Sequence, residues 1–486
     1  MKKETAAKAE RNPLMILLFF AWISFNLALL WLHEPWRDEA NVFLMAKELT
    51  PVSLIREIRY QGHPCLWYLL VMLLAKANLP FVSISVLSFL ITGAAAYLFV
   101  FRAPLNPVLK ACFLASPVFT YYYPVVARNY CLIALLLMLL AYLYPKRNEK
   151  GFLYGLLLAL LVQADTIAIP LAGMIFLWWI LPSAKGGNSS KKGRLGLLLF
   201  PASLAFWGVQ FLHVTDSPEF HVTRPSLSEL PQRVLSVSEG IIARLTPFSG
   251  KIPLIILILL LAAAIFTAVW TKKIFPLLTL LSAVLFEALF SIFIYELHIW
   301  HYLMLGYALL WFLWVSADET DPSSVPFLIP QLVLSAFAVC MLIRSCLPSE
   351  TLGLRNALTG LYSDSKNAAD YIRENIPSDA LIVETNVSES SPVLALLGKD
   401  YVFYYAGTFT PETYADYGLS QSSETSYKAL CEKIRNQFEN IGNFYIMECK
   451  TSCLSNLPED AEVLYESPEM TARGEEYRIL KVTPGK

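Results

Sequence analysis

Long apolar runs separated by short polar loops fill the first 346 residues of the chain. The first run covers residues 13–32, and most later runs are long enough for a helix that crosses a bilayer. This pattern predicts a polytopic α-helical membrane protein with about eleven transmembrane helices. The later runs are residues 81–101, 110–126, 130–145, 151–165, 167–182, 195–213, 251–271, 275–296, 302–317 and 325–345.

The loop at residues 33–80 predicts two helices that do not cross the membrane. Residues 37–49 are typical of one short helix with acidic residues in its first turn. Residues 64–76 are mostly apolar, but at about a dozen residues they are too few for a span. Trp67 and Tyr68 suit the headgroup boundary. We expect both helices to lie along the outer leaflet and to form the floor of an external cavity.

The chain changes character after residue 347, where charges become frequent and apolar positions fall into short amphipathic segments. Helical and strand patterns alternate, which predicts a soluble α/β domain over residues 347–486. Its sequence has no Gly-rich phosphate loop or nucleophile elbow, so little supports a catalytic role there. The predicted helices are residues 365–374, 392–397 and 426–438, and the predicted strands are residues 380–384, 401–405, 444–448, 462–465 and 477–482.

Composition excludes an ordinary soluble enzyme, because 56% of the residues are hydrophobic, 16% are charged and the mean hydropathy is +0.50. A net charge of -1 gives no field that would attract nucleic acid. The positive-inside rule assigns the basic loops to the cytoplasm, so we expect the loop 33–80, Arg128 and the C-terminal domain to lie outside it. The predicted location is a bacterial cytoplasmic membrane. The basic loops are residues 102–110, 146–150, 185–194 and 272–273.

Asp38 and Glu39 form an acidic pair close to the end of the first apolar run. Charges near a bilayer are costly unless water, a partner or a function keeps them there. Acidic residues are also favoured in the first turn of a helix by the helix dipole. The residues alone therefore leave a catalytic role and a helix-capping role open.

A second polar group, made of Glu296, His298 and His301, follows the run at 275–296. Carboxylate and imidazole at this spacing are candidate ligands for a divalent metal, and Glu296 and His298 are the first candidates. Placement in the aromatic belt at the headgroup level is the alternative explanation.

The chain resembles the GT-C superfamily of membrane glycosyltransferases, and in particular the family 39-like branch of protein O-mannosyltransferases and lipid A aminoarabinose transferases. The resemblance is clearest in the first 140 residues and includes a soluble domain after the last span. It implies that residues 1–346 form the glycosyltransferase part. The matching motifs are WRDEA at 36–40, GHPCLWYLL at 62–70 and ARNYCLIALL at 127–136.

This resemblance implies transfer of a sugar from a polyprenyl-phosphate donor to a lipid, glycan or protein acceptor on the outer face. The reaction needs a base to take the acceptor proton and cations to hold the phosphate as charge develops. Matching the motif makes Asp38 the candidate base. Glu39 is displaced by about 100° around the helix, so we expect it to orient the helix or a substrate hydroxyl. Direct attack predicts inversion at the anomeric carbon.

The same match makes Arg128, His63 and His301 candidates for binding the donor phosphate, because a guanidinium fork or an imidazole can hold phosphate oxygens. Their structural alternatives are an interfacial Arg that reaches the headgroups and a His in a turn. Asp165 is a candidate contact to sugar or metal, or simply a helix end in water. Within the matching motifs, Arg37 and Tyr68 are further candidates for binding substrate.

Two other classes of protein share parts of this pattern. A transporter or flippase of lipid-linked substrates would have the same apolar bulk and basic loops, but it would not explain an acidic pair, a His-Pro motif and an Arg on one face. A noncatalytic membrane scaffold that displays its C-terminal domain is the third hypothesis.

Overall fold

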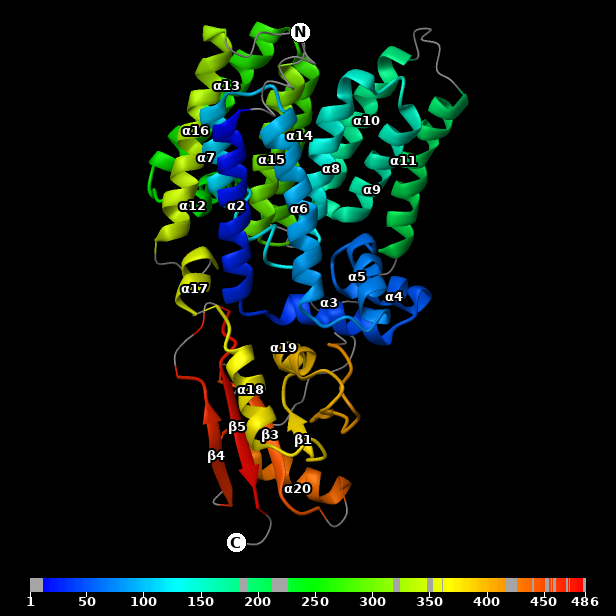
Figure 1. Cartoon of the computed structure of the whole chain (residues 1–486), viewed down its shortest axis with the longest axis vertical. Helices are drawn as coiled ribbons and strands as arrows, with labels where there is room; N and C mark the ends of the chain where they lie inside the picture. The colour runs from blue at the N-terminus through cyan, green and yellow to red at the C-terminus, as the bar shows by residue number, and fades with distance from the viewer. Residues whose placement is uncertain are drawn as a thin grey trace. The chain divides into compact units, whose positions relative to one another are not determined.

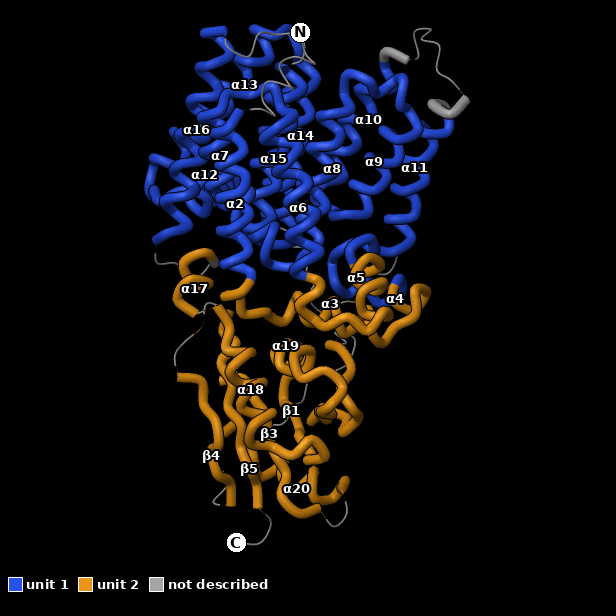
Figure 2. The backbone as a smooth tube through the Cα atoms, viewed as in Figure 1, with its two compact units in different colours: residues 1–30, 55–67, 85–348 blue, residues 31–54, 68–84, 349–486 orange. Residues whose placement is uncertain are grey.

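The computed structural model describes most of the chain. The residues before 12 and residues 184–190, which belong to a basic loop that supports the predicted membrane orientation, lie outside the described part. The chain divides into two compact units, which Figure 2 shows in different colours. Unit 1 contains residues 1–30, 55–67 and 85–348, and unit 2 contains residues 31–54, 68–84 and 349–486. The described residues are 12–183, 191–211, 226, 228–317, 324–347, 353–360, 362–415, 426–438, 441–450, 454, 455, 457, 460–468, 471 and 473–483.

Unit 1 is a bundle of apolar helices, as expected for a protein embedded in a membrane. Across the described residues, six helices of the chain are long and apolar enough to cross a bilayer, fewer than the eleven expected. The remaining apolar runs form shorter helices, among which α9 packs against α11 and α8 (Figure 1). The six long helices are α2 (Pro13–Leu32), α6 (Ser83–Arg102), α13 (Ile252–Thr271), α14 (Ile274–Phe293), α15 (Ile299–Ser316) and α16 (Val325–Cys346). The other helices are α7 (Pro107–Ala115), α8 (Tyr130–Leu143), α9 (Gly151–Ala164), α10 (Ile169–Ser183), α11 (Lys191–Gln210) and α12 (Leu230–Leu245), with 3₁₀ turns η2 (Tyr144–Lys146) and η3 (Thr166–Ala168).

The span expected at residues 110–126 is wrong. Helix α7 ends at Ala115, and residues 116–129 form a buried coil without helix or strand. Pro117 and Pro124 disfavour a continuous helix there. Polar side chains of neighbouring helices satisfy the backbone of the coil, which is the condition for irregular backbone in an apolar unit. Trp22 Nε1 donates to the Phe119 carbonyl (2.8 Å), Asn26 Oδ1 accepts from the Tyr121 amide (3.2 Å), Ser88 Oγ and Thr92 Oγ1 donate to the Tyr123 carbonyl (2.7 and 2.9 Å), and Tyr307 donates to the Val118 carbonyl (2.6 Å).

The loop between α2 and α6 contains both of the helices expected there. Helix α3 (Arg37–Glu48) ends one residue before the predicted end at residue 49. Helix α5 (Leu66–Lys76) begins two residues after the predicted start at residue 64. Helix α4 (Pro51–Glu57) and the 3₁₀ turn η1 (Ile58–Tyr60) between them were not foreseen. Residues 31–54 belong to unit 2 together with the C-terminal domain, whereas the sequence grouped the whole loop with the spans.

The C-terminal domain is the α/β domain that its sequence predicts. Five strands form one sheet in the order β2-β1-β3-β5-β4, in which β1 pairs in parallel with β2 and β3, while β5 pairs antiparallel with β3 and β4 (Figure 1). The predicted helix at 392–397 begins five residues earlier, because Asn386 caps the amides of Ser388 and Glu389. The elements are α17 (Gly353–Thr359), α18 (Ser365–Asn375), β1 (Ile382–Glu384), α19 (Val387–Leu397), β2 (Phe403–Tyr405), α20 (Tyr427–Gln437), β3 (Phe444–Cys449), β4 (Ala461–Glu466) and β5 (Tyr477–Val482).

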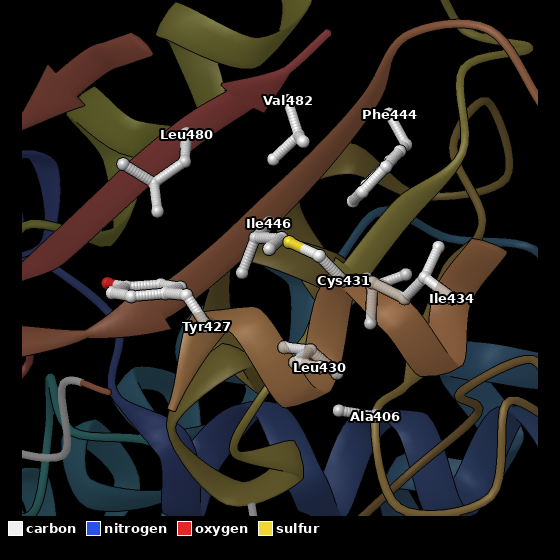
Figure 3. Packing of buried hydrophobic residues seen from close by; sticks show 10 residues of the cluster. Ala406, Tyr427, Leu430, Cys431, Ile434, Phe444, Ile446, Leu480 and Val482 are labelled. Atoms are coloured by element: carbon white, nitrogen blue, oxygen red, sulfur yellow. The ribbon is translucent and has the colours of Figure 1, made fainter. Parts of the chain in front are cut away.

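The core of this domain lies between α20 and one face of the sheet (Figure 3). Leu430 and Ile434 of α20 are fully buried against Ile446 of β3 and Leu480 of β5. Ile446 and Leu480 are cross-strand partners, so alternate positions of the two strands share this face. The opposite face contacts α19, where Tyr477 donates a hydrogen bond to the carbonyl of Glu389.

Candidate functional site

The candidate site in unit 1 is a polar group formed by His63, Arg128 and Asp165. Arg128 Nη2 donates to His63 Nε2 at 2.8 Å, and His63 Nδ1 lies 3.3 Å from Asp165 Oδ2. Because Nε2 accepts from the guanidinium, Nδ1 carries the imidazole proton and directs it at the carboxylate. Three residues that the sequence named separately are therefore in direct contact.

The buried coil and the start of α8 position Arg128, which is 7% exposed. Its neighbour Asn129 donates through Nδ2 to Asp165 Oδ2 at 2.6 Å and to the Ala164 carbonyl at 2.8 Å. Asp165 Oδ1 also accepts the amide of Ile167 at 3.0 Å, which caps η3. Asp165 thus holds the site together from the end of α9, and as a 2% exposed side chain it presents little surface to a sugar.

A network of amide side chains fixes the loop that carries His63. Gln210 Oε1 accepts the backbone amide of Cys65 at 2.9 Å, and Gln210 Nε2 donates to Gln163 Oε1 at 2.7 Å. Gln163 Nε2 donates in turn to the carbonyl of Ser203 at 2.9 Å. These bonds run from the His63 loop to α9 and α11, so the imidazole is attached to two helices of the bundle.

His301 extends the polar group on the side of α15. Its Nε2 lies 3.1 Å from the hydroxyl of Tyr130, and its Nδ1 accepts the backbone amide of His298 at 3.0 Å. The ring of Tyr130 also packs edge-on against His63 at 5.9 Å. One tyrosine therefore connects the two histidines that the sequence proposed for the phosphate.

Glu296 and His298, the candidate metal ligands, have other partners in the structure. Glu296 forms an ion pair with Arg244, and His298 Nε2 bonds the hydroxyl of Tyr295 at 2.9 Å. Among the described residues, no three His, Cys, Asp or Glu side chains gather closely enough to hold a metal ion. Guanidinium and phenol partners take the places that a metal would need.

Glu287, in the middle of α14, is the site residue that the sequence reading missed. It is fully buried, and within the described residues neither carboxylate oxygen has a hydrogen-bond partner. Helix α14 contacts η3, which follows Asp165 directly, and the charges of Glu287 and Asp165 are near enough to interact. A carboxylate in the middle of the apolar run 275–296 was the available signal.

A small apolar cavity of about 50 Å³ lies between α12, α13, α14, α15 and α16. Leu280 and Val284 line it and precede Glu287 by two turns and one turn, so all three occupy one side of α14. Tyr302 lines the same cavity and donates or accepts a bond with Ser291 at 3.0 Å. An apolar chain fits such a lining.

Asp38, Glu39, Arg37 and Tyr68 belong to unit 2. Asp38 is partly exposed in the first turn of α3, whereas Glu39 is fully buried. Glu39 Oε2 accepts the amide of Trp36 at 3.2 Å and bonds His33 Nε2 at 2.8 Å, which are the contacts of a residue that orients the helix. Arg37 forms an ion pair with Glu389 at 3.7 Å, and Tyr68 is buried on α5.

No family model and no curated protein matches the chain. The polar group of unit 1 can bind an anion through Arg128, because its guanidinium carries several N–H donors. The first turn of α3 offers a carboxylate, Asp38, that can accept a proton.

Proposed function

We propose that the chain is a membrane glycosyltransferase that moves a sugar from a polyprenyl-phosphate donor to an acceptor on the extracytoplasmic face. The observation that carries this proposal is the contact of Arg128 with His63 and of His63 with Asp165 in an apolar unit. Such polar groups are expensive in a membrane protein and mark functional sites. His63 and Arg128 fall in two of the three motifs that resemble GT-C enzymes.

In the proposed reaction, Arg128 binds the phosphate oxygens of the donor. The acceptor oxygen or nitrogen attacks the anomeric carbon, the bond from that carbon to the phosphate oxygen breaks, and polyprenyl phosphate leaves with the electron pair. A planar guanidinium can hold two phosphate oxygens while their charge grows. His63, held by Asp165 through Nδ1, offers a further donor at Nε2 when its imidazole is protonated.

The resemblance to GT-C enzymes assigns the proton of the acceptor to Asp38. It is the partly exposed member of the acidic pair, and its neighbour Glu39 is engaged by Trp36 and His33. A positioned carboxylate base contributes about a hundredfold to ten-thousandfold to such a step.

A transporter or flippase of lipid-linked substrates is the second candidate. The apolar cavity beside α14 supports the transferase and the transporter equally, because the apolar part of a lipid would contact that lining in either class of protein. Transport needs no base, whereas transfer needs one. The two candidates therefore differ in what Asp38 does.

The test is transfer of radiolabelled sugar from a panel of polyprenyl-phosphate donors to a membrane extract. Asp38→Asn is compared with wild type and with Glu48→Gln, which makes the same chemical change at an exposed position of α3. We expect Asp38→Asn to lower the rate at least about a hundredfold, Arg128→Lys to raise the KM of the donor, and Glu48→Gln to leave both unchanged.

An Asp38→Asn variant as active as wild type would remove Asp38 as the base. If wild type transfers sugar from none of the donors but moves lipid-linked sugar across vesicle membranes, the transporter becomes the better proposal.

A further inference from the structure

The segment around the first turn of α3 is bound by residues of the C-terminal domain. The backbone amide of Arg37 donates to Glu475 Oε1 at 3.0 Å, and Ser365 Oγ donates to the Pro35 carbonyl at 2.7 Å. These bonds join positions that are 438 and 330 residues apart in the chain. The turn that carries Asp38 is therefore completed by the C-terminal domain.

Helix α3 supplies an acceptor of its own for one amide at its start. Glu39 accepts the amide of Trp36, as the helix residue of a capping box does. Arg37 is the first residue of α3, so its amide has no acceptor within the helix. Glu475 supplies that acceptor, and a carboxylate at this end also interacts favourably with the helix dipole.

The surroundings of Glu475 keep its carboxylate in this place. The side chain is fully buried, and its own amide donates to Thr471 Oγ1 at 2.9 Å. Two residues away, Arg473 stacks over the ring of Trp36 at 3.9 Å. Helix α19 packs along α3, and Asn41 exchanges hydrogen bonds with the backbone of Ala415 at 2.8 and 3.4 Å. Contacts on several sides of α3 thus come from the C-terminal domain.

We infer that Glu475 is a positioning residue for Asp38, and that the C-terminal domain serves to set the first turn of α3. The effect on sugar transfer rests on the proposed function, whereas the effect on the turn does not. Glu475 acts on the helix backbone next to Asp38, and it is assigned no contact with substrate. This gives a role in the reaction to a domain whose own sequence has no catalytic motif.

The first readout is independent of activity. Hydrogen exchange of the amides at residues 37–41 is measured in the full-length protein in lipid nanodiscs. We expect Glu475→Ala to speed their exchange about tenfold, because an amide loses its acceptor. Glu475→Gln keeps one acceptor oxygen and should restore most of the protection. Glu374→Gln, at an exposed position of α18, is the matched control and should exchange as wild type does.

The second readout is the rate of transfer. Loss of position at the base should lower kcat of Glu475→Ala about tenfold with the KM of the donor unchanged, and Glu475→Gln should recover kcat. Exchange in Glu475→Ala within twofold of wild type would overturn the inference at the turn. Faster exchange with unchanged kcat would overturn the positioning role. If wild type transfers no sugar, the proposed function fails and the exchange data still decide whether Glu475 holds the turn.

Discussion

Asp38 and Glu39 are adjacent in the chain but have different surroundings. Glu39 is fully buried and its Oε2 is engaged by Trp36 and His33, while Asp38 keeps some exposed surface in the same turn. One step along a helix turns a side chain by about 100°, so neighbours face different environments. Burial therefore separates a carboxylate that builds the helix from one that keeps part of its surface exposed.

Glu287 presents the opposite case, a carboxyl group whose removal should strengthen the fold. An unpartnered acid in an apolar interior costs free energy, and replacing it with an apolar side chain of similar size is stabilising. We expect Glu287→Leu to raise the free energy of unfolding by about 1–3 kcal/mol. Thermal unfolding in nanodiscs measures this, and Glu287→Gln should show a smaller gain. A lower unfolding temperature in Glu287→Leu would mean that the carboxyl group has a stabilising partner in the folded protein.

At the scale of elements, the coil at residues 116–129 approaches α15 where that helix has a glycine. A Cβ atom at Gly306 would lie 2.6 Å from Val118 Cγ2, well inside van der Waals contact. We expect Gly306→Ala to lower the free energy of unfolding by about 1–3 kcal/mol, because a stiff β-branched side chain must move. It should also shift Arg128, which lies near the end of the same coil.

Thermal unfolding and transfer rate together measure the effect of Gly306→Ala. Gly208→Ala on α11, where an added Cβ meets nothing within 4 Å, is the matched control and should be neutral or slightly stabilising. A Gly306→Ala protein as stable as the control would show that the coil can move away from α15 without cost.

The sequence predicted some elements closely and others poorly for a physical reason. Helix α18 and strand β5 follow simple periodic patterns in a soluble domain, so periodicity determined them. The run at 110–126 is apolar like a span, but the coil depends on Asn26 and Tyr307, which lie far away in the chain. Likewise His63, Arg128 and Asp165 were each named from the sequence. Their contacts, and the role of Asn129 between them, depend on tertiary packing that no local pattern contains.

At the scale of the whole molecule, unit 2 contains buried acids that couple its stability to pH. Ser390 Oγ lies 3.2 Å from Glu384 Oε2 and from both oxygens of Glu412, and one hydroxyl can donate to only one carboxylate at a time. Burial raises the pKa of Glu384 to about 8, although the bond to Ser390 opposes this, and burial also raises the pKa of Glu412. Burial raises the pKa of Glu475 to about 7 against the influence of Arg37.

A carboxyl group with a raised pKa in the folded state binds its proton more tightly there than in the unfolded chain. Its contribution to stability is complete below the ordinary pKa of 4.5 and is lost as the pH rises through about 7 for Glu475 and about 8 for Glu384. We expect the free energy of unfolding of unit 2 to fall by on the order of 5 kcal/mol between pH 5 and pH 9. Glu384→Gln should lessen this fall and Glu374→Gln should not. Circular dichroism of the full-length protein during thermal unfolding measures it, and a stability that rises over this range would contradict the prediction.

The hydrogen bond from Tyr307 to the Val118 carbonyl also bears on how the protein is made. The two residues are 189 positions apart, so the coil leaves the ribosome long before α15 exists. Until α15 is inserted, the Val118 carbonyl lacks this donor, and an unsatisfied carbonyl is excluded from hydrocarbon. The early segments must then be retained near water or within the insertion machinery. Folding of this membrane unit is therefore completed late in synthesis, when α15 packs against the helices that were synthesised before it.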